Sequence, residues 1–275
     1  MTLKRSQPAR IMGILNVTPD SFSDGGQFTD PQRAVDHALK MVASGASILD
    51  LGAESTRPGS TGTAPAEQLA RILPVLKILR SKTQIEISID TQSAVVAEAC
   101  LSEGADIIND ISALYADPEM IRVLSQHKTC RVVVMHMLGT PATMQIAPAY
   151  ADVVGDILRF FEERLSICER AGINRERIWI DPGFGFGKTF EHNLEIVRRF
   201  ETFRVLKCPL IAGVSRKGFL GRLTSESTPS QRDAASIAAG LFLARKGADI
   251  LRVHDVAGHT AALNVFDAFE RLEGS

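Results

Sequence analysis

The sequence has few cysteines and no excess of charge of either sign. Its 275 residues include four cysteines, and their wide spacing excludes a zinc knuckle or a CxxC redox motif. We interpret all four, Cys100, Cys130, Cys168 and Cys208, as small buried apolar residues. The 31 basic and 32 acidic residues give a net charge of −1, so the charge balance predicts neither a nucleic-acid nor a membrane partner.

Long apolar runs are missing as well. The run Ile11–Leu15 follows the basic residues Lys4, Arg5 and Arg10 and is too short for a signal peptide. The most apolar stretch, Ala234–Ala244, falls far below the ~18 residues that a membrane-spanning helix requires. We therefore predict a cytoplasmic protein.

Eight short apolar runs alternate with longer amphipathic segments. Continuous runs rich in β-branched residues are typical of strands buried on both faces, as in a parallel sheet. The predicted strands are Ile11–Leu15, Ser47–Leu51, Ile85–Ile89, Asp106–Asn109, Val132–Met135, Ile178–Asp181, Leu210–Val214 and Ile250–Val253. The predicted helices are Pro31–Ser44, Ala64–Arg80, Ser93–Glu103, Pro118–Gln126, Tyr150–Ala171, Glu191–Phe203, Gln231–Lys246 and His259–Leu272.

This alternation predicts an α/β fold. Eight strand–helix units in a chain of this length favour a (β/α)8 TIM barrel, and a doubly wound sheet is the alternative. No linker, internal repeat or low-complexity segment interrupts the pattern. We therefore expect residues 1–275 to form a single barrel domain.

Polar side chains stand where several of the predicted strands end. Asp90, Asn109 and Asp181 end the third, fourth and sixth strands, and catalytic groups of such barrels lie at these ends. Asp110 follows in the same place, but a helix N-cap explains it equally well. Carboxylates in a barrel mouth are costly unless they are paired, and a flat ligand with several N–H donors would pair them.

Two loops and two strand ends complete this pattern. The loops at 16–26 and 52–60 are rich in small residues, and loops of this length are more often functional lids than plain turns. Ser215, Arg216 and Lys217 end the seventh strand, and Arg252 and His254 lie on one face of the eighth. The cation pair of Arg252 and His254 suits a phosphate or pyrophosphate, and surface ion pairs are the alternative.

Other motifs do not support a function of their own. The stretch 183–189 resembles a P-loop, but Pro182 occupies the position where a P-loop requires glycine. His254 and His259 do not have the spacing of a helical zinc pair. His136 lies between two methionines and is better explained as a packed side chain than as a metal ligand.

Taken together, segments at the strand ends resemble the dihydropteroate synthase family. The matching segments are 12–26, 50–59, 88–91, 108–110, 134–137, 181–189, 213–217 and 252–255. They run in order through nearly the whole chain, one at each strand end. Each alone is a moderate signal, but all eight in register are highly specific.

The resemblance implies a homodimeric (β/α)8 barrel that acts as a transferase in folate biosynthesis. Such an enzyme joins 6-hydroxymethyl-7,8-dihydropterin pyrophosphate to para-aminobenzoate, giving 7,8-dihydropteroate and pyrophosphate. Mg²⁺ assists, and sulfonamides compete with para-aminobenzoate. The reaction is expected to be SN1-like, with pyrophosphate lost before the amine attacks.

The resemblance also assigns roles in binding the pterin and pyrophosphate. It implies that Asp90, Asn109 and Asp181 bind the N–H edge of the pterin, that Lys217 binds its ring carbonyl and a ring nitrogen, and that Arg252 stacks over the ring. Asn16 would hold Mg²⁺, and Thr56, Arg252 and His254 would neutralise the pyrophosphate. Lys217, Arg252, Asp90 and Asp181 are the expected catalytic residues.

The two loops are expected to close over the second substrate. Phe22, Pro58 and Phe186 would hold the ring of para-aminobenzoate, and Ser215 or a nearby backbone N–H its carboxylate. Asp24 and Arg57 would pair to hold the closed loops. Closure would keep water from the reactive cation.

Three other functions remain as alternatives. A pterin-binding methyltransferase module shares the barrel, but the segments Thr18–Phe22 and Thr56–Pro58 argue against it. A non-catalytic relative would have no reason to keep Asn16 and His254 together with Lys217 and Arg252. A class I aldolase would use Lys217 as a Schiff base, and no other feature of the sequence supports this.

Overall fold

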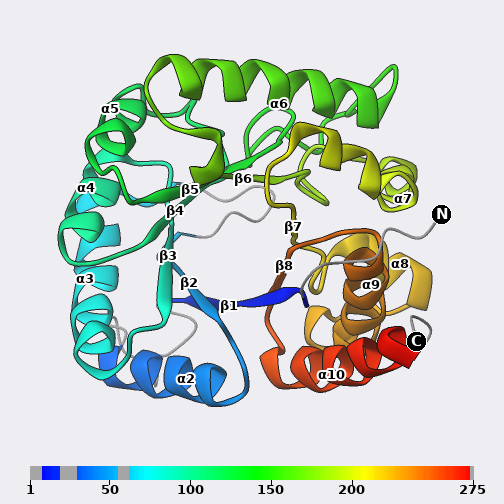
Figure 1. The fold of residues 1–275 in the computed structure, drawn as a ribbon, viewed down its shortest axis with the longest axis horizontal. Coiled ribbons are helices and arrows are strands. Elements are labelled where there is room, and N and C mark those ends of the chain that lie inside the picture. The colour runs from blue at the N-terminus through cyan, green and yellow to red at the C-terminus, as the bar shows by residue number, and fades with distance from the viewer. Residues whose placement is uncertain (1–7, 19–29, 55–61, 273–275) are drawn as a thin grey trace.

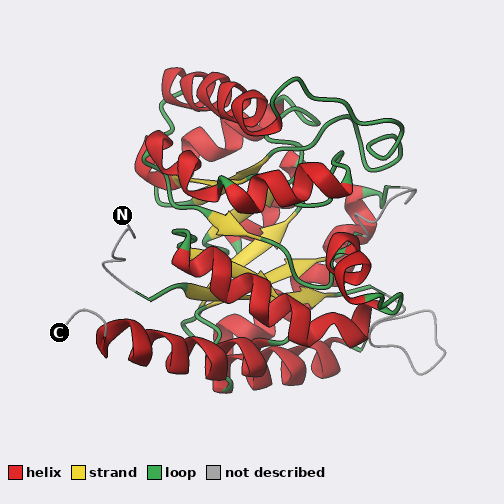
Figure 2. Ribbon diagram, turned by 90° about the vertical axis from the view of Figure 1, so that its right-hand side faces the viewer, coloured by secondary structure: helices red, strands yellow, loops and turns green. Residues whose placement is uncertain are grey.

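The computed structural model describes residues 8–18, 30–54 and 62–272. In this part of the chain, eight parallel strands surround a central axis and helices cover them on the outside (Figures 1 and 2). The strands are β1 Arg10–Asn16, β2 Ile48–Gly52, β3 Glu86–Asp90, β4 Ile107–Asp110, β5 Arg131–Met135, β6 Ile178–Asp181, β7 Ile211–Ala212 and β8 Ile250–Val253.

The strands follow one another around a closed barrel. Hydrogen bonds join them in the order β6-β5-β4-β3-β2-β1-β8-β7. The ring closes between β6 and β7, where the amide N of Ile180 donates to the carbonyl O of Pro209 at 3.0 Å and Ile180 pairs with Leu210. The predicted (β/α)8 barrel is confirmed, and the doubly wound alternative is wrong.

The helices lie between the strands, as the sequence predicts. They are α2 Pro31–Ala43, α3 Pro65–Lys82, α4 Ala94–Ser102, α5 Glu119–Gln126, α6 Val153–Arg170, α7 Phe190–Arg198, α8 Gly218–Thr224, α9 Asp233–Arg245 and α10 Val256–Leu272. Local signals explain their boundaries. The side chain of Asp30 caps α2 by accepting from the amide N of Gln32 at 2.9 Å, and Gly45, with φ +103°, follows the helix end.

Three segments differ from the prediction. The strand predicted at Leu210–Val214 is shorter, because the carbonyl of Val214 accepts from the amide N of Lys217 in a turn. The helix predicted to reach Phe203 ends at Arg198, and a 3-10 segment, Phe200–Leu206, follows. Phe200, Phe203 and Leu206 are buried at intervals of three, which is the 3-10 period. Helix α8 was not predicted.

The inward faces of the strands change character along the barrel axis. Near the strand starts, the interior is filled by one apolar cluster of Met12, Ile48, Ile107, Val133, Trp179, Ile211 and Ile250. Side chains two residues further along a strand point to the same face. At that level Asp50, Asn109, Asp181 and Arg252 point inward. The barrel is therefore apolar at one end and polar at the other.

The four cysteines occupy the apolar core, as predicted. Each is buried and free. Burial raises the pKa of the Cys168 and Cys208 thiols to about 11, so both stay protonated at neutral pH. No helix within the described ranges is long and apolar enough to cross a membrane.

Candidate active site

Four strands contribute polar side chains to one hydrogen-bonded network at the carboxyl end of the barrel. Arg252 on β8 donates from Nε to Oδ2 of Asp50 on β2 at 2.7 Å and from Nη2 to Oδ2 of Asp90 on β3 at 2.8 Å. Nδ2 of Asn109 on β4 donates to the same Asp50 oxygen at 3.1 Å. The barrel thus brings side chains from distant parts of the sequence to one point.

Asp50 is the member of this network to which the sequence analysis gave no role. Its side chain is fully buried, and Nη2 of Arg252 also lies 2.6 Å from its Oδ2. Its other oxygen, Oδ1, has no hydrogen-bond partner in the described part of the chain. A signal was present in the sequence, because Asp50 stands two residues after Ile48, on the inward face of a strand that is otherwise apolar.

Burial makes two carboxyl groups of the site, those of Asp90 and Asp181, easier to protonate than carboxyl groups in water. Burial raises the pKa of Asp90, and the nearby Asp50 adds to this effect while Arg252 opposes it. Burial likewise raises the pKa of Asp181, although the amide N of Gly183 donates to its Oδ1 at 2.7 Å and Lys217 opposes the rise. A ligand that donates N–H groups to these two carboxylates would therefore stabilise their charged forms.

Lys217 stands beside these carboxyl groups at the start of α8. Burial and the charge of Arg252 lower its pKa to about 8, against the opposing effect of Asp181 and Asp90. Its Nζ lies 4.0 Å from the centroid of the Phe186 ring. Gly185 leaves room for its stem, since a Cβ on Gly185 would lie 3.3 Å from Cδ of Lys217.

Ser215 and His254 form a hydrogen-bonded pair on the next two strand ends. Oγ of Ser215 lies 2.9 Å from Nδ1 of His254 and accepts from its backbone N at 3.2 Å. Burial, with Arg216 and Arg252 nearby, lowers the pKa of His254 to about 3. His254 is therefore neutral at pH 7 here, and it would offer a hydrogen bond rather than a charge to an incoming anion.

Asn16 ends β1 at the rim of the same site. Its Oδ1 and Oδ2 of Asp90 lie 3.8 and 3.7 Å from the point that a Cβ on Gly52 would occupy. The described residues contain no cluster of three or more His, Cys, Asp or Glu side chains that could hold a metal. A single amide oxygen fits Mg²⁺, which takes one or two protein ligands and completes its shell with water and phosphate.

Apolar side chains line one wall beside Lys217. Ile111, Met135, Met144 and Phe186 form a buried cluster, with Met137 packed against it. His136 is packed behind this wall. It meets Phe160 edge-on at 4.8 Å, and burial, with the charge of Lys188, lowers its pKa to about 2. The expectation that His136 is a packed side chain is confirmed.

The structure brings most of the expected site residues together. Asp90, Asn109, Asp181, Lys217 and Arg252 share one region, with Asn16, Phe186, Ser215 and His254 around it. The remaining expected residues, Phe22, Asp24, Thr56, Arg57 and Pro58, lie outside the described residues.

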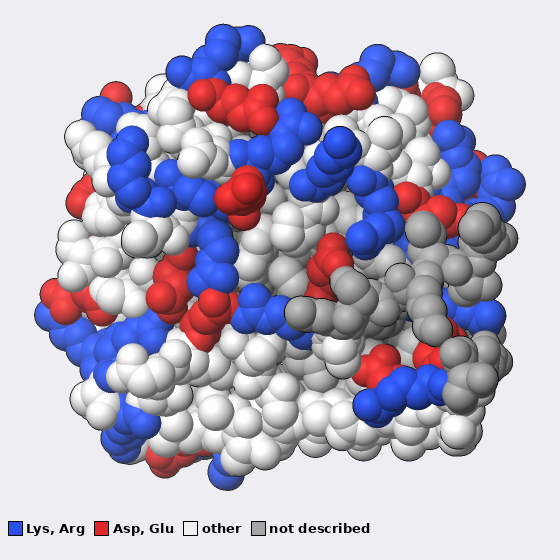
Figure 3. Space-filling view, in the orientation of Figure 1, with Lys and Arg blue, Asp and Glu red and all other residues white. Residues whose placement is uncertain are grey.

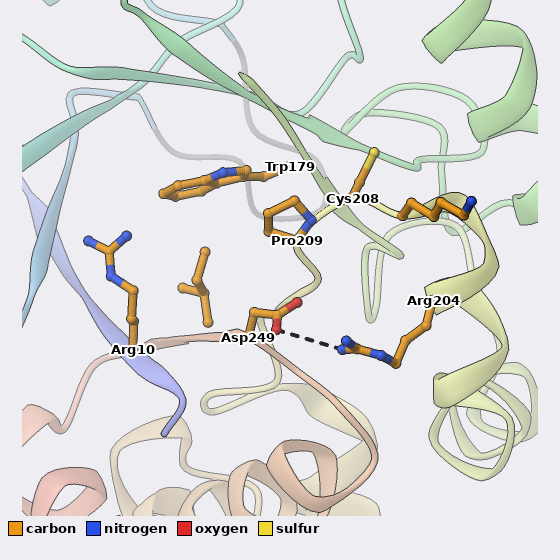
Figure 4. Close-up of a pocket in the computed structure, with 8 residues that line it drawn as sticks. Arg10, Trp179, Arg204, Cys208, Pro209 and Asp249 are labelled. Atoms are coloured by element: carbon orange, nitrogen blue, oxygen red, sulfur yellow. Dashed lines mark ion pairs between the residues drawn. The ribbon is translucent and has the colours of Figure 1, made fainter. Parts of the chain in front are cut away.

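A separate cavity lies at the opposite end of the barrel, where the strands begin (Figure 4). It has a volume of about 420 Å³ and is lined by Arg10, Trp179, Arg204, Lys207, Cys208, Pro209, Asp249 and Ile250. Arg10 pairs with Glu86, and Arg204 pairs with Asp249 at 3.6 Å. Because of these ion pairs, most of the cavity's charged side chains are paired within the protein, and none of its lining residues belongs to the network above. Figure 3 shows basic side chains interspersed with acidic ones on one face of the molecule.

Comparison with known proteins identifies the family of this chain. The family described as pterin binding enzyme matches residues 12–254. The dihydropteroate synthase of Escherichia coli strain K12 is 42% identical over 267 residues, which cover 97% of this chain and 93% of the relative.

Two solved structures share the fold. A Yersinia pestis dihydropteroate synthase in complex with a sulfonamide drug has a TM-score of 0.90 at 39% identity, covering 96% of this chain and 95% of that one. A Xanthomonas albilineans dihydropteroate synthase in complex with 7,8-dihydropteroate has a TM-score of 0.86 at 41% identity, covering 96% and 94%.

We predict that Asp50→Asn lowers the free energy of unfolding by about 3 kcal/mol, because it removes a buried charge from its pair with Arg252. Urea denaturation measures this value. Glu67→Gln, which removes an exposed partner of Arg71, is the control and should change stability little. Equal stability of the Asp50 variant and the wild type would show that the pair contributes nothing to the fold.

Proposed function

This chain belongs to the pterin-binding enzyme family, and we propose that it has dihydropteroate synthase activity. It transfers the pterin-methyl group from 6-hydroxymethyl-7,8-dihydropterin pyrophosphate to the amine of para-aminobenzoate. The products are 7,8-dihydropteroate and pyrophosphate, in folate biosynthesis. The observation that carries this conclusion is the network of Asp50, Asp90, Asn109 and Arg252, completed by Asp181 and Lys217, in the mouth of the barrel.

The pterin lies deepest in the proposed complex. The carboxyl groups of Asp90 and Asp181 accept from its N–H edge, and Asn109 binds beside them. Their raised pKa values support this role, because a donor to either carboxylate offsets the cost of burying the charge. Lys217 donates to the ring carbonyl and a ring nitrogen, and Arg252 stacks over the ring. A site of this kind rejects analogues that lack the matching groups by about 10⁴–10⁵.

The pyrophosphate lies nearer the rim. We place Asn16 as the protein ligand of Mg²⁺, which supplies positive charge to the leaving group when it is bound. Arg252 and His254 donate hydrogen bonds to the phosphate oxygens, and Thr56 is assigned to the same group. The anion also raises the pKa of His254, since a nearby negative charge favours the protonated imidazole.

Bond breaking precedes bond making in the proposed reaction. The bond between the methylene carbon and the pyrophosphate oxygen breaks, and the electron pair leaves with pyrophosphate. The aromatic amine then bonds to the methylene carbon and loses a proton. Because this amine is already unprotonated near neutral pH, no strong base is required.

The Ser215–His254 pair does not favour a covalent alternative. The sequence alone shows no such pair, but the fold places the two side chains within hydrogen-bond distance. A serine nucleophile needs a base to take its proton, and in the proposed complex His254 instead donates to the phosphate oxygens. The buried hydroxyl also holds the backbone of His254. The pair therefore supports a positioning role for Ser215.

The amine substrate is bound beside Lys217. Phe186 offers its ring from the apolar wall, and Ser215 or a neighbouring N–H takes the carboxylate. Phe22 and Pro58, together with the Asp24–Arg57 pair, are assigned to the closing loops. Sulfonamides would compete here, as the drug complex of the Yersinia pestis relative suggests.

The oligomeric state and location that we propose follow from the surface and the thiols. Helices α9 and α10 expose large apolar side chains to solvent, namely Phe242 on α9 and Val265, Phe269 and Leu272 on α10. They support a homodimer, which sedimentation of the purified protein measures. Four free buried thiols support a reducing compartment such as the cytoplasm.

The first test measures pyrophosphate release from dihydropterin pyrophosphate and Mg²⁺, with and without para-aminobenzoate. We expect release that depends on the amine and yields dihydropteroate. Pterin binding without release would favour the methyltransferase module or the non-catalytic relative. Trapping of Lys217 by borohydride with a carbonyl substrate would favour the aldolase.

Asp181→Asn is predicted to weaken pterin binding by about 2 kcal/mol, because an amide replaces a charge-assisted acceptor. Isothermal titration calorimetry gives the affinity. The control is Asp30→Asn, which removes a carboxylate that caps α2 and should leave the affinity for the pterin unchanged. Full affinity in the Asp181 variant would remove this residue from the pterin site.

The rate is predicted to depend on the protonation of Lys217. Since its pKa is lowered to about 8, kcat/KM for the pterin substrate should fall as pH rises through this value, as the free enzyme loses the ammonium proton. Lys217→Arg should move the fall to higher pH, and Lys246→Arg, at a surface ion pair, should not. A profile of the wild type that stays level to pH about 10 contradicts the role.

A further inference from the structure

Three consecutive backbone carbonyls in the loop between β6 and α7 are each held by a different side chain. Nε2 of Gln145 donates to the carbonyl of Gly185 at 2.6 Å, and Nζ of Lys188 donates to that of Phe186 at 2.9 Å. Oη of Tyr150 donates to the carbonyl of Gly187 at 2.8 Å. The three bonds cover Phe186 and the residues on both sides of it.

The same contacts join this loop to the loop between β5 and α6, residues 136–152. Gln145 and Tyr150 belong to the latter loop. Lys188, which is only 3% exposed, also donates to the carbonyl of His136 at 3.2 Å and lies 3.0 Å from its Nδ1. The Nζ of Lys188 thus has three atoms within hydrogen-bond distance, two of them on His136 and the third on Phe186.

Glycine residues allow the backbones of the two loops to come into direct contact. Gly183 and Gly187 have φ of +71° and +64°. A Cβ on Gly183 would lie 2.0 Å from the carbonyl O of His136, and one on Gly187 would lie 2.7 Å from Leu138. The alternating glycines of the stretch 183–189, which do not form a P-loop, therefore serve this contact.

The backbone of Phe186 is hydrogen-bonded on both sides of its ring. The amide N of Phe186 donates to the carbonyl of Gly183 at 3.1 Å, so its backbone is bonded on both sides. Its ring, 9% exposed, lies against the ammonium of Lys217 at 4.0 Å. Met144, from the loop that carries Gln145 and Tyr150, belongs to the same apolar cluster.

We propose that Gln145, Tyr150 and Lys188 form a clamp that positions Phe186 and thereby sets the affinity for the aromatic amine substrate. The inference rests on the proposed function, which places the ring of para-aminobenzoate against Phe186. None of the three is assigned to either substrate, so each is a positioning residue. The carboxyl and amide groups assigned to the pterin, those of Asp90, Asn109 and Asp181, stand on strand ends to which none of the three clamp side chains is hydrogen-bonded.

Tyr150→Phe is the substitution that tests the clamp. It removes the bond to Gly187 and keeps the ring, which meets His192 edge-on at 4.9 Å. We expect KM for para-aminobenzoate to rise about fivefold, the effect of losing one hydrogen bond, and KM for the pterin substrate to change less, because only Lys217 among the pterin groups contacts Phe186. Lys188→Met is avoided, because it would leave two buried carbonyls without their donor and threaten the fold.

The matched control is Tyr115→Phe. It removes the other tyrosine hydroxyl of the chain, which donates to Glu163 at 3.4 Å. Glu163 is not part of the clamp. Its KM values should equal those of the wild type. An equal rise of KM in both variants would show that loss of a tyrosine hydroxyl acts without the clamp and would overturn the proposal.

A double-mutant cycle with Phe186→Ala separates positioning from a general effect on the fold. In the Phe186→Ala background, Tyr150→Phe should leave KM for para-aminobenzoate unchanged, because the ring that it positions is gone. The melting temperature should fall in both backgrounds. A rise of KM that is equal in both backgrounds overturns the proposal, and so does an unchanged KM in the single variant.

The two proposals fail in different ways. Absence of dihydropteroate formation by the wild type contradicts the proposed function. An active wild type whose Tyr150→Phe variant has the same KM for para-aminobenzoate contradicts the clamp alone.

Discussion

The guanidinium of Arg252 is the interaction on which the rest of the site depends. Two carboxylates on adjacent strands, Asp50 and Asp90, point into the barrel, and Asp50 is fully buried. Such charges are tolerated inside a protein only when they are paired. Arg252 bonds to both, although it lies 202 and 162 residues away from them in the chain. The pairing exists only once β8 has joined β1, so the site and the closed barrel depend on each other.

The same strand faces stabilise one end of the barrel and perform chemistry at the other. On β6, Trp179 packs in the apolar layer, and Asp181, two residues later, enters the polar one. On β2, Ile48 and Asp50 divide the two tasks in the same way. Because alternate residues share a face, each of these two strands carries an apolar anchor and a functional group with no change of backbone direction. The chemistry is therefore held as firmly as the core.

The residues assigned to the two substrates are held in place by different parts of the structure. Apart from Lys217 at the start of α8, the groups assigned to the pterin stand on strand ends, whose positions follow from the barrel. Phe186, assigned to the amine, stands on a loop, and a loop has no ladder of hydrogen bonds to hold it. Gln145, Tyr150 and Lys188 supply that support from side chains instead. One substrate site is thus built by the sheet and the other by contacts between loops.

The sequence by itself determined the barrel, the ends at which polar residues gather, and the family. Periodicity and strand-end chemistry are local, so they can be read from neighbouring residues. Only the tertiary structure decided which polar residues act as partners. Asp50 acquires a partner only when Arg252 lies against it, and Ser215 meets His254 only across two strand ends. The clamp likewise joins loops that are separate in the chain. Hydrogen bonds and charge pairing depend on distance in space, and the closure of the barrel sets that distance for residues far apart in sequence.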